Sequence, residues 1–228
     1  MEIAKRLGRK ILVLGSDRNK EYDWARNFLK NYRIVIDVGC GTGTFLEFPE
    51  FDSIGVDVNP ENIKYCLEKH LNAKPGNALN LPFRDSEFEA AHCSHLLQVF
   101  SSHDAVRLIQ ELNRVTCPGG RIVITTLNDF RSFYRHPENS RPYPPDSLRR
   151  LFGTQNFSQS PMFPDVPLLR EVGIKLRHPA LIEMRFSSSI RLGKFASVLN
   201  ASQRIIGLRK WWRFDAYTIC FEKDNSLT

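Results

Sequence analysis

The sequence has 228 residues, of which 42% are hydrophobic and 25% are charged, a balance that is ordinary for a soluble globular protein. This length suits one full-sized domain, and no run of about 18 apolar residues offers a membrane span. The apolar run at residues 11–14 is too short for the core of a signal peptide, so we expect a cytoplasmic protein.

The net charge of +7 is concentrated in one segment, residues 164–213. That segment contains ten Lys or Arg residues and three Asp or Glu residues, whereas the remainder of the chain has 22 of each sign. Such a local excess predicts an anionic partner for this segment rather than a generally cationic protein.

The five cysteines are scattered along the chain, and no two of them form a C-x-x-C pair. This spacing argues against a zinc site and against a framework of disulfides. We expect reduced, mostly buried thiols and no bound metal.

Short β-branched runs alternate with helix-like segments from residue 33 onward, which is the pattern of a parallel sheet with crossover helices. The predicted elements in chain order are a helix at 20–31, strands at 33–38 and 53–58, a helix at 60–71, a strand at 89–94, a helix at 104–115 and a strand at 121–126. Residues 128–146 predict a long loop that could close over a substrate. A short helix at 147–152 and a last, antiparallel strand at 216–222 complete the prediction.

Three glycines at alternate positions follow the first predicted strand, in the run Val35-Ile36-Asp37-Val38-Gly39-Cys40-Gly41-Thr42-Gly43. Glycine has no Cβ and tolerates positive φ, so a ligand can lie directly against the backbone. We expect the free N–H groups at the start of a following helix to face the same space. The run therefore predicts a ligand-binding loop, and the alternative is a structural turn that binds nothing.

The position of the third glycine bears on the kind of ligand. A dinucleotide-binding G-x-G-x-x-G motif counted from Gly39 would need glycine where Thr44 stands, whereas the glycine falls at Gly43. Dinucleotide binding is disfavoured but stays open. A P-loop would need a G-K-[ST] ending, which is absent.

Three further motifs follow the glycine loop. Asp57 stands at the tip of the second predicted strand, where an open α/β sheet offers an acceptor to ribose hydroxyls, although a plain charge at a helix N-terminus is the alternative. Residues 76–83 form a polar loop with an apolar floor, which suits an adenine ring. Residues 111–121 end a helix with Pro-Gly-Gly and begin a strand.

With these four motifs in this order, the chain resembles the class I S-adenosylmethionine-dependent methyltransferases, particularly the ubiquinone/menaquinone-type and small-molecule enzymes. The resemblance covers residues 33–157 and implies an α/β, Rossmann-like fold, a mostly parallel twisted sheet with helices on both faces and an antiparallel last strand. It implies one domain, 1–228, whose core spans 33–157 and 214–223. A lid loop at 128–146 and a basic substrate-cap insertion at 164–213 would complete it.

The resemblance also implies S-adenosylmethionine as cofactor and assigns residues to it. Asp37 and the three glycines would surround its methionine part, and Asp57 would take both ribose hydroxyls. Asn77 and the backbone of Ala78 would meet the adenine, while Cys93 and Ser94 would lie beside the sulfonium. The complete predicted set is Asp37, Gly39, Cys40, Gly41, Gly43, Asp57, Val58, Asn77, Ala78, Cys93 and Ser94.

Two positions depart from the family's pattern. The family usually has Asp where Asn77 stands, but an amide oxygen can still accept from the adenine amino group, so we expect a modest loss of affinity. Cys117 replaces the Lys or Arg that commonly precedes Pro-Gly-Gly, at a position that is usually on the surface.

Methyl transfer from a sulfonium requires an acceptor held in line and protected from water. A base is needed only where the acceptor's proton is not otherwise lost. His95, directly after the predicted strand at 89–94, is our first candidate for a catalytic base, and a structural, hydrogen-bonded histidine is the alternative. The other candidates are His103, Tyr134, His136 and Tyr143, whereas His92 is expected to be structural.

The sequence leaves three functions open, and it does not define an oligomeric state. Residues 93–96 lack the acidic-or-Asn-Pro-Pro-aromatic motif of enzymes that methylate DNA base amines or glutamine amides, which disfavours that class. The first function is methylation, at oxygen, of a small-molecule, lipid-type or glycan-type acceptor. The second is RNA methylation through the basic segment 164–213, and the third is a non-catalytic binding protein of this fold.

The segment 164–213 itself has two readings. Its apolar residues recur at helical spacing, which is typical of a cap helix packed on the core. The same pattern, with Trp211 and Trp212 beside basic residues, also suits a helix that rests on an anionic membrane surface or contacts an RNA backbone. We therefore expect a cytoplasmic protein, with a peripheral location at the membrane as the alternative.

Overall fold

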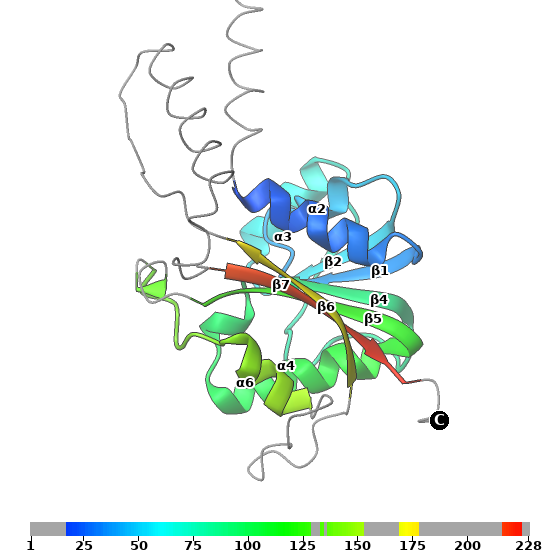
Figure 1. Cartoon of the computed structure of the whole chain (residues 1–228). Helices are drawn as coiled ribbons and strands as arrows, with labels where there is room; N and C mark the ends of the chain where they lie inside the picture. The colour runs from blue at the N-terminus through cyan, green and yellow to red at the C-terminus, as the bar shows by residue number, and fades with distance from the viewer. Residues whose placement is uncertain (1–16, 129–132, 135, 153–168, 178–215, 225–228) are drawn as a thin grey trace, which may run out of the picture.

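The computed structural model describes residues 17–128, 133–134, 136–152, 169–177 and 216–224. Its centre is a seven-stranded sheet in the order β3-β2-β1-β4-β5-β7-β6, with helices on both faces (Figure 1). The elements are α2 (Asp17–Leu29), β1 (Ile34–Val38), the 3-10 turn η1 (Phe45–Glu47), β2 (Asp52–Asp57), α3 (Pro60–Glu68), β3 (Ala73–Pro75), β4 (Phe88–Ser94), the 3-10 turn η2 (Leu97–Val99), α4 (Ser102–Val115), β5 (Thr116–Leu127), α6 (Pro145–Phe152), β6 (Leu169–Arg177) and β7 (Ala216–Lys223).

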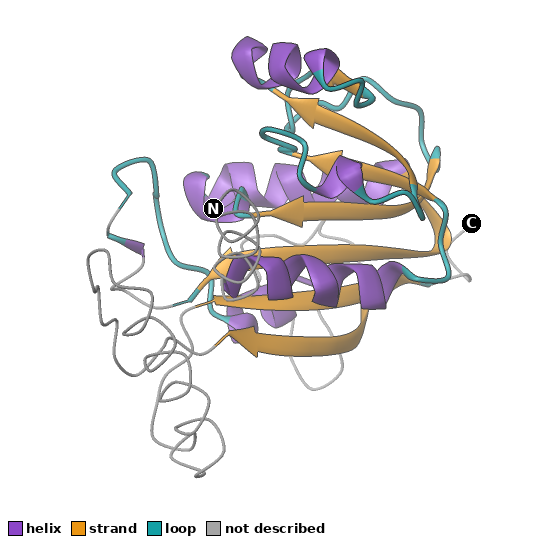
Figure 2. Ribbon diagram, turned by 90° about the horizontal axis from the view of Figure 1, so that it is seen from above, coloured by secondary structure: helices purple, strands orange, loops and turns teal. Residues whose placement is uncertain are grey.

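The sheet is mostly parallel, as the sequence predicts. β1 pairs in parallel with β2 and β4, β2 with β3, and β4 with β5. β7 runs antiparallel to both β5 and β6, so the prediction of an antiparallel last strand is confirmed. The carboxyl ends of β1, β2, β4 and β5 therefore lie at one edge of the sheet (Figure 2). Ligands bind at this edge in open α/β sheets.

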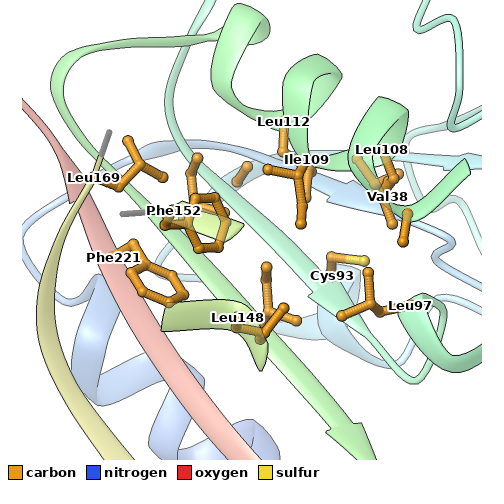
Figure 3. Close-up of a cluster of buried hydrophobic side chains, with 14 of the residues drawn as sticks. Val38, Cys93, Leu97, Leu108, Ile109, Leu112, Leu148, Phe152, Leu169 and Phe221 are labelled. Carbon is orange, nitrogen blue, oxygen red and sulfur yellow. The ribbon is translucent and has the colours of Figure 1, made fainter. Parts of the chain in front are cut away.

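The larger hydrophobic core lies between the sheet and the helices α4 and α6 (Figures 1 and 3). Ser101 precedes helix α4 and caps it, because its side chain accepts from the Asp104 N–H. The helix turns Leu108, Ile109 and Leu112 toward the strands. Helix α6 adds Leu148 and Phe152, and all of these side chains except Ser101 and Asp104 are fully buried.

The opposite face of the sheet is covered by α2 and α3 (Figure 1). Ala25 and Leu29 of α2 are fully buried against Val35 and Val123 of the sheet. No helix in the described ranges is long and apolar enough to cross a membrane.

Three differences from the predicted elements concern β3, β6 and the turn after the glycine loop. Strand β3 has only three residues, too few for its pattern to stand out in the sequence. Strand β6 lies inside the segment 164–213, so part of the predicted cap insertion belongs to the central sheet. The remainder of that segment falls outside the described residues. The helix expected directly after the glycine loop is a single 3-10 turn, because Pro49 follows it and β2 begins at Asp52.

Candidate active site

The glycine loop leaves the carboxyl end of β1 through three residues with positive φ. The φ angles are +75° at Gly39, +53° at Gly41 and +81° at Gly43, in the region that disfavours side chains. The N–H groups of Gly39 and Cys40 both donate to the Val56 carbonyl of β2, at 2.8 and 3.1 Å. The loop is therefore folded back against the second strand.

The three glycines serve different purposes. A Cβ added at Gly39 would lie 2.9 Å from Leu96, and one added at Gly43 would lie 2.6 Å from Leu71 and 2.9 Å from Cys66. A Cβ at Gly41 would meet nothing within 4 Å. Gly39 and Gly43 thus allow close packing, whereas Gly41 faces open space in which a ligand can approach the backbone.

Asp57 closes the other side of this space. Its Oδ2 accepts from the Gly41 N–H at 2.9 Å, and its Oδ1 accepts from the Asn59 N–H at 2.8 Å and from Asn62 Nδ2 at 3.2 Å. These three bonds orient the carboxylate and leave acceptor capacity for a ribose hydroxyl. Asn62, on α3, is a positioning contact that the sequence did not reveal.

The predicted adenine site is formed by an exposed apolar residue and a polar loop. Val58 is 79% exposed directly after Asp57, which makes it available to the face of a ring. Asn77 follows β3, but its side-chain oxygen accepts from the Leu79 N–H at 2.9 Å. An adenine amino group would have to share that oxygen or displace the turn. The contacts of Asn77 and Ala78 with adenine stay predictions.

Asp37 is paired inside the protein. Its Oδ1 lies 2.7 Å from Nδ1 of His92, and both side chains are at least 96% buried. The ring of His92 stacks on Phe45, with centroids 4.1 Å apart. His92 is structural, as expected, and the Asp37 side chain braces β1 against β4 at the start of the loop.

The Cys93 side chain points into the hydrophobic core rather than toward the glycine loop. Its side chain is 1% exposed and belongs to the cluster with Val38 and Leu97 (Figure 3). Burial raises the pKa of this thiol and of Cys40, so neither is a reactive nucleophile. A contact of Cys93 with the sulfonium could come only from its backbone, while Ser94 is partly exposed at the end of β4.

His95 directly precedes Leu96, whose side chain lies against Gly39 of the glycine loop. The imidazole is 25% exposed, and its Nε2 lies 2.8 Å from Oε2 of Glu21. Glu21 is buried on α2, and sequence reasoning missed it. One signal was available: Glu21 precedes the buried residues Ala25 and Leu29 by four and eight positions, so it occupies the inward face of the helix.

The other candidate bases are placed less favourably. Tyr143 is 2% exposed and its hydroxyl donates to the carbonyls of Phe100 and Ser101, and burial raises its pKa to about 12. Tyr134 is 73% exposed, and His136 lies at the surface beside Glu138. His103 is exposed on the first turn of α4.

The residues at this edge of the sheet fit the predicted cofactor. Gly41 offers bare backbone to open space, Asp57 offers an oriented carboxylate, and Val58 offers an apolar surface. A carboxylate and backbone groups suit a cationic nucleoside without phosphate. Within the described ranges, no group of three or more His, Cys, Asp or Glu side chains is placed to hold a metal ion.

Fold and site together define a Rossmann-like domain whose candidate nucleoside site lies at the carboxyl edge of its sheet. A family model described as a methyltransferase domain matches residues 36–124, from β1 into β5. A solved S-adenosylmethionine-dependent methyltransferase from Archaeoglobus fulgidus has the same fold, with a TM-score of 0.62 and 22% identity, over 92% of this chain and 95% of that one. Residues 36–124 therefore match a methyltransferase domain, and the chain shares the fold of that solved structure.

Curated relatives match about half of the chain. Demethylmenaquinone methyltransferase from Deinococcus radiodurans is 31% identical over 148 residues, covering 56% of this chain and 61% of that protein. Fatty-acid O-methyltransferase from Mycolicibacterium smegmatis is 34% identical over 129 residues, covering 51% and 44%. tRNA (carboxymethyluridine(34)-5-O)-methyltransferase from Arabidopsis thaliana is 35% identical over 94 residues, covering 40% and 23%. The chain thus spans less than two thirds of these relatives.

Proposed function

We propose that this protein transfers the methyl group of S-adenosylmethionine to an oxygen atom of a small-molecule, lipid-type or glycan-type acceptor. The observation that carries the proposal is that His95 has a partly exposed imidazole and directly precedes Leu96, the residue that lies against Gly39. Two relatives support oxygen as the acceptor atom, since their names specify O-methylation, one of them on a fatty acid.

The residues of the site divide the chemistry between them. When bound, S-adenosylmethionine supplies an electrophilic methyl group with a good leaving group. Asp57 and the backbone at Gly41 would hold the nucleoside, and His95 would accept the proton of the acceptor hydroxyl as the new carbon–oxygen bond forms. Positioning of the acceptor in line with the methyl group can contribute up to about 7–11 kcal/mol to catalysis.

Methyl-labelled S-adenosylmethionine tests the proposal directly. The purified protein is incubated with the labelled donor and with separated small-molecule, lipid, glycan and RNA fractions of a cell extract. We expect label in one of the first three fractions, and we expect His95→Ala to abolish it. His103→Ala should retain the label and serves as the control, because His103 is an exposed histidine that also follows β4 in the chain. Label in RNA alone would overturn the proposed acceptor class.

RNA is the second candidate acceptor, and two observations favour it. A relative is named as a tRNA methyltransferase, and the segment 164–213 carries an excess of seven positive charges. RNA binding should then weaken steeply with salt, and neutralising Arg209, Lys210 and Arg213 should reduce that salt dependence. Absence of RNA binding at low salt would remove this candidate.

A membrane surface is the third partner to test. A lipid-type acceptor would bring the protein to a bilayer, and the basic segment with Trp211 and Trp212 would favour anionic lipid. Co-sedimentation with vesicles should therefore increase with their anionic lipid content. Equal sedimentation with neutral and anionic vesicles would contradict a peripheral membrane role.

A further inference from the structure

Glu21 joins three segments that are far apart in the sequence. Its side chain, on α2, is 3% exposed. One carboxylate oxygen, Oε2, lies 2.8 Å from His95 Nε2, and the other, Oε1, lies 3.0 Å from Arg177 Nη1 at the end of β6. The contact with Arg177 is an ion pair rather than a well-aligned hydrogen bond.

Both ends of the contact are fixed at the carboxyl edge of the sheet. β6 and β5 run parallel to each other, because both pair antiparallel with β7. Arg177 of β6 and Leu127 of β5 both pair with Ala216 of β7, so they lie at the same end of the sheet. The backbone of His95 has a φ of +55°, an uncommon angle for a residue with a side chain, and its N–H donates to the Thr125 carbonyl at 2.8 Å. The imidazole is therefore held through its backbone and through Nε2.

The chemistry of the pair determines which ring nitrogen carries hydrogen. A carboxylate only accepts hydrogen bonds, so Nε2 of a neutral imidazole must be the donor to Glu21. The lone pair then lies on Nδ1, which has no hydrogen-bond partner within the part of the chain that the structure describes. The 25% of the His95 side chain that stays exposed gives an acceptor access to the ring.

We propose that Glu21, paired with Arg177, is a positioning residue that holds His95 in the Nε2–H tautomer and so makes Nδ1 the atom that takes the acceptor's proton. This inference rests on the proposed function. In the step, the methyl carbon–sulfur bond breaks, a carbon–oxygen bond forms, and the hydroxyl proton moves to Nδ1. The imidazolium that results is stabilised by the adjacent carboxylate.

Packing of the protein interior does not by itself explain the charged side chains of Glu21 and Arg177. Buried ion pairs can often be replaced by apolar residues without loss of stability, because desolvation offsets their attraction. Glu21 occupies the same inward face of α2 as Ala25 and Leu29, where an apolar side chain would suffice. A carboxylate at this position instead fixes a hydrogen on a neighbouring ring, which an apolar side chain cannot do.

Glu21→Gln gives a sharp test, because it should reverse the tautomer. Arg177 can only donate, so the new amide oxygen should face Arg177 and the amide NH2 should face His95. Nε2 would then accept, and the hydrogen would move to Nδ1. Nitrogen-15 NMR of histidine-labelled protein, recorded at about pH 9 where an ordinary imidazole is neutral, distinguishes the two nitrogens.

We expect His95 to show the Nε2–H form in the wild type and the Nδ1–H form in Glu21→Gln. Arg177→Met keeps the carboxylate and should keep the Nε2–H form. The matched control is Glu171→Gln. Glu171 lies on β6, as Arg177 does, but it pairs with Arg149, so its replacement should leave the His95 tautomer unchanged. Each variant is checked for binding of S-adenosylhomocysteine by calorimetry, which we expect to stay within about threefold of wild type.

Three results would overturn the inference. They are the Nδ1–H form in the wild type, an unchanged tautomer in Glu21→Gln, and a ring that stays doubly protonated at the measuring pH. The spectra are recorded on the protein without acceptor, so a wrong acceptor class would leave them unaffected. Failure of the proposed function would appear instead as label in RNA alone in the methyl-transfer assay.

Discussion

Asp57 and Gly41 are joined by a hydrogen bond of 2.9 Å, from the Gly41 N–H to Oδ2 of the carboxylate. The end of the second strand therefore fixes the one glycine of the loop that faces open space. Because the same carboxylate is oriented by Asn59 and Asn62, the loop geometry and the predicted ribose contact involve the same side chain.

Replacing Asp57 by alanine should weaken binding of S-adenosylhomocysteine by about 100-fold or more. The variant would lose the predicted charge-assisted hydrogen bond to ribose, worth about 1.5–3 kcal/mol, and also the bond that fixes Gly41. Isothermal titration calorimetry measures the loss. The control is Asp52→Ala, an exposed acid at the opposite end of the same strand, for which we expect unchanged affinity. Equal loss in both variants would contradict the ribose role.

Alanine substitutions at Gly41 and Gly43 should differ in how much they reduce cofactor affinity and how much they reduce folding stability. In Gly41→Ala the added methyl group meets open space, so folding should lose only about 1–2 kcal/mol, for a side chain at positive φ, while cofactor affinity falls by tenfold or more. In Gly43→Ala the methyl group also collides with Leu71 and Cys66, which adds about 1–3 kcal/mol. Urea denaturation and calorimetry compare the two. A larger loss of stability in Gly41→Ala would contradict the assignment.

The sheet could be predicted from the sequence where burial leaves a clear pattern. β1, β4 and the second half of β5 are apolar runs between helices, and their positions agree with the predicted strands to within a few residues. β6 could not be predicted, because four of its nine residues are Arg or Lys or Glu and it lies at the sheet edge, where one side stays open to solvent. The charge pattern of β6 is therefore as typical of a surface cap as of a strand.

In the site, the sequence located the loop but could not show where each side chain points. Strand side chains alternate between faces, so Asp37 and Cys93 point to opposite faces of the sheet although both precede site loops. Glu21 is 74 residues away from His95, and only the packing of α2 on the sheet brings them together. Such contacts depend on tertiary structure, which no local motif encodes.

His92→Leu should destabilise the fold by about 3–5 kcal/mol, because it leaves the Asp37 carboxylate buried without its partner. The double variant Asp37→Asn with His92→Leu should recover part of that loss, since no buried charge then remains unpaired. Denaturant unfolding of the single and double variants measures the coupling. Additive losses would show that the two side chains act independently.

Glu111 connects α4 to the predicted adenine loop, residues 76–83. Its Oε2 accepts from the Leu81 N–H and from Arg114, whose guanidinium also donates to the carbonyls of Leu81 and Phe83. The hydrogen bond from Arg114 and the one from Leu81 lower the pKa of Glu111 below its ordinary value of 4.5, despite partial burial. The carboxylate therefore stabilises the folded protein only while it is ionised.

Glu111→Gln should accordingly cost about 2 kcal/mol at neutral pH. A carboxyl whose pKa is lower in the folded state contributes its stability above the unfolded pKa and loses it as the pH falls toward the folded value. The difference between wild type and variant should thus be constant from pH 7 to about 5.5 and shrink as the pH falls through 4.5. Urea midpoints across this range measure the difference. A gap that widens at low pH would contradict the assigned role, because an acid that is destabilising when ionised gives that opposite slope.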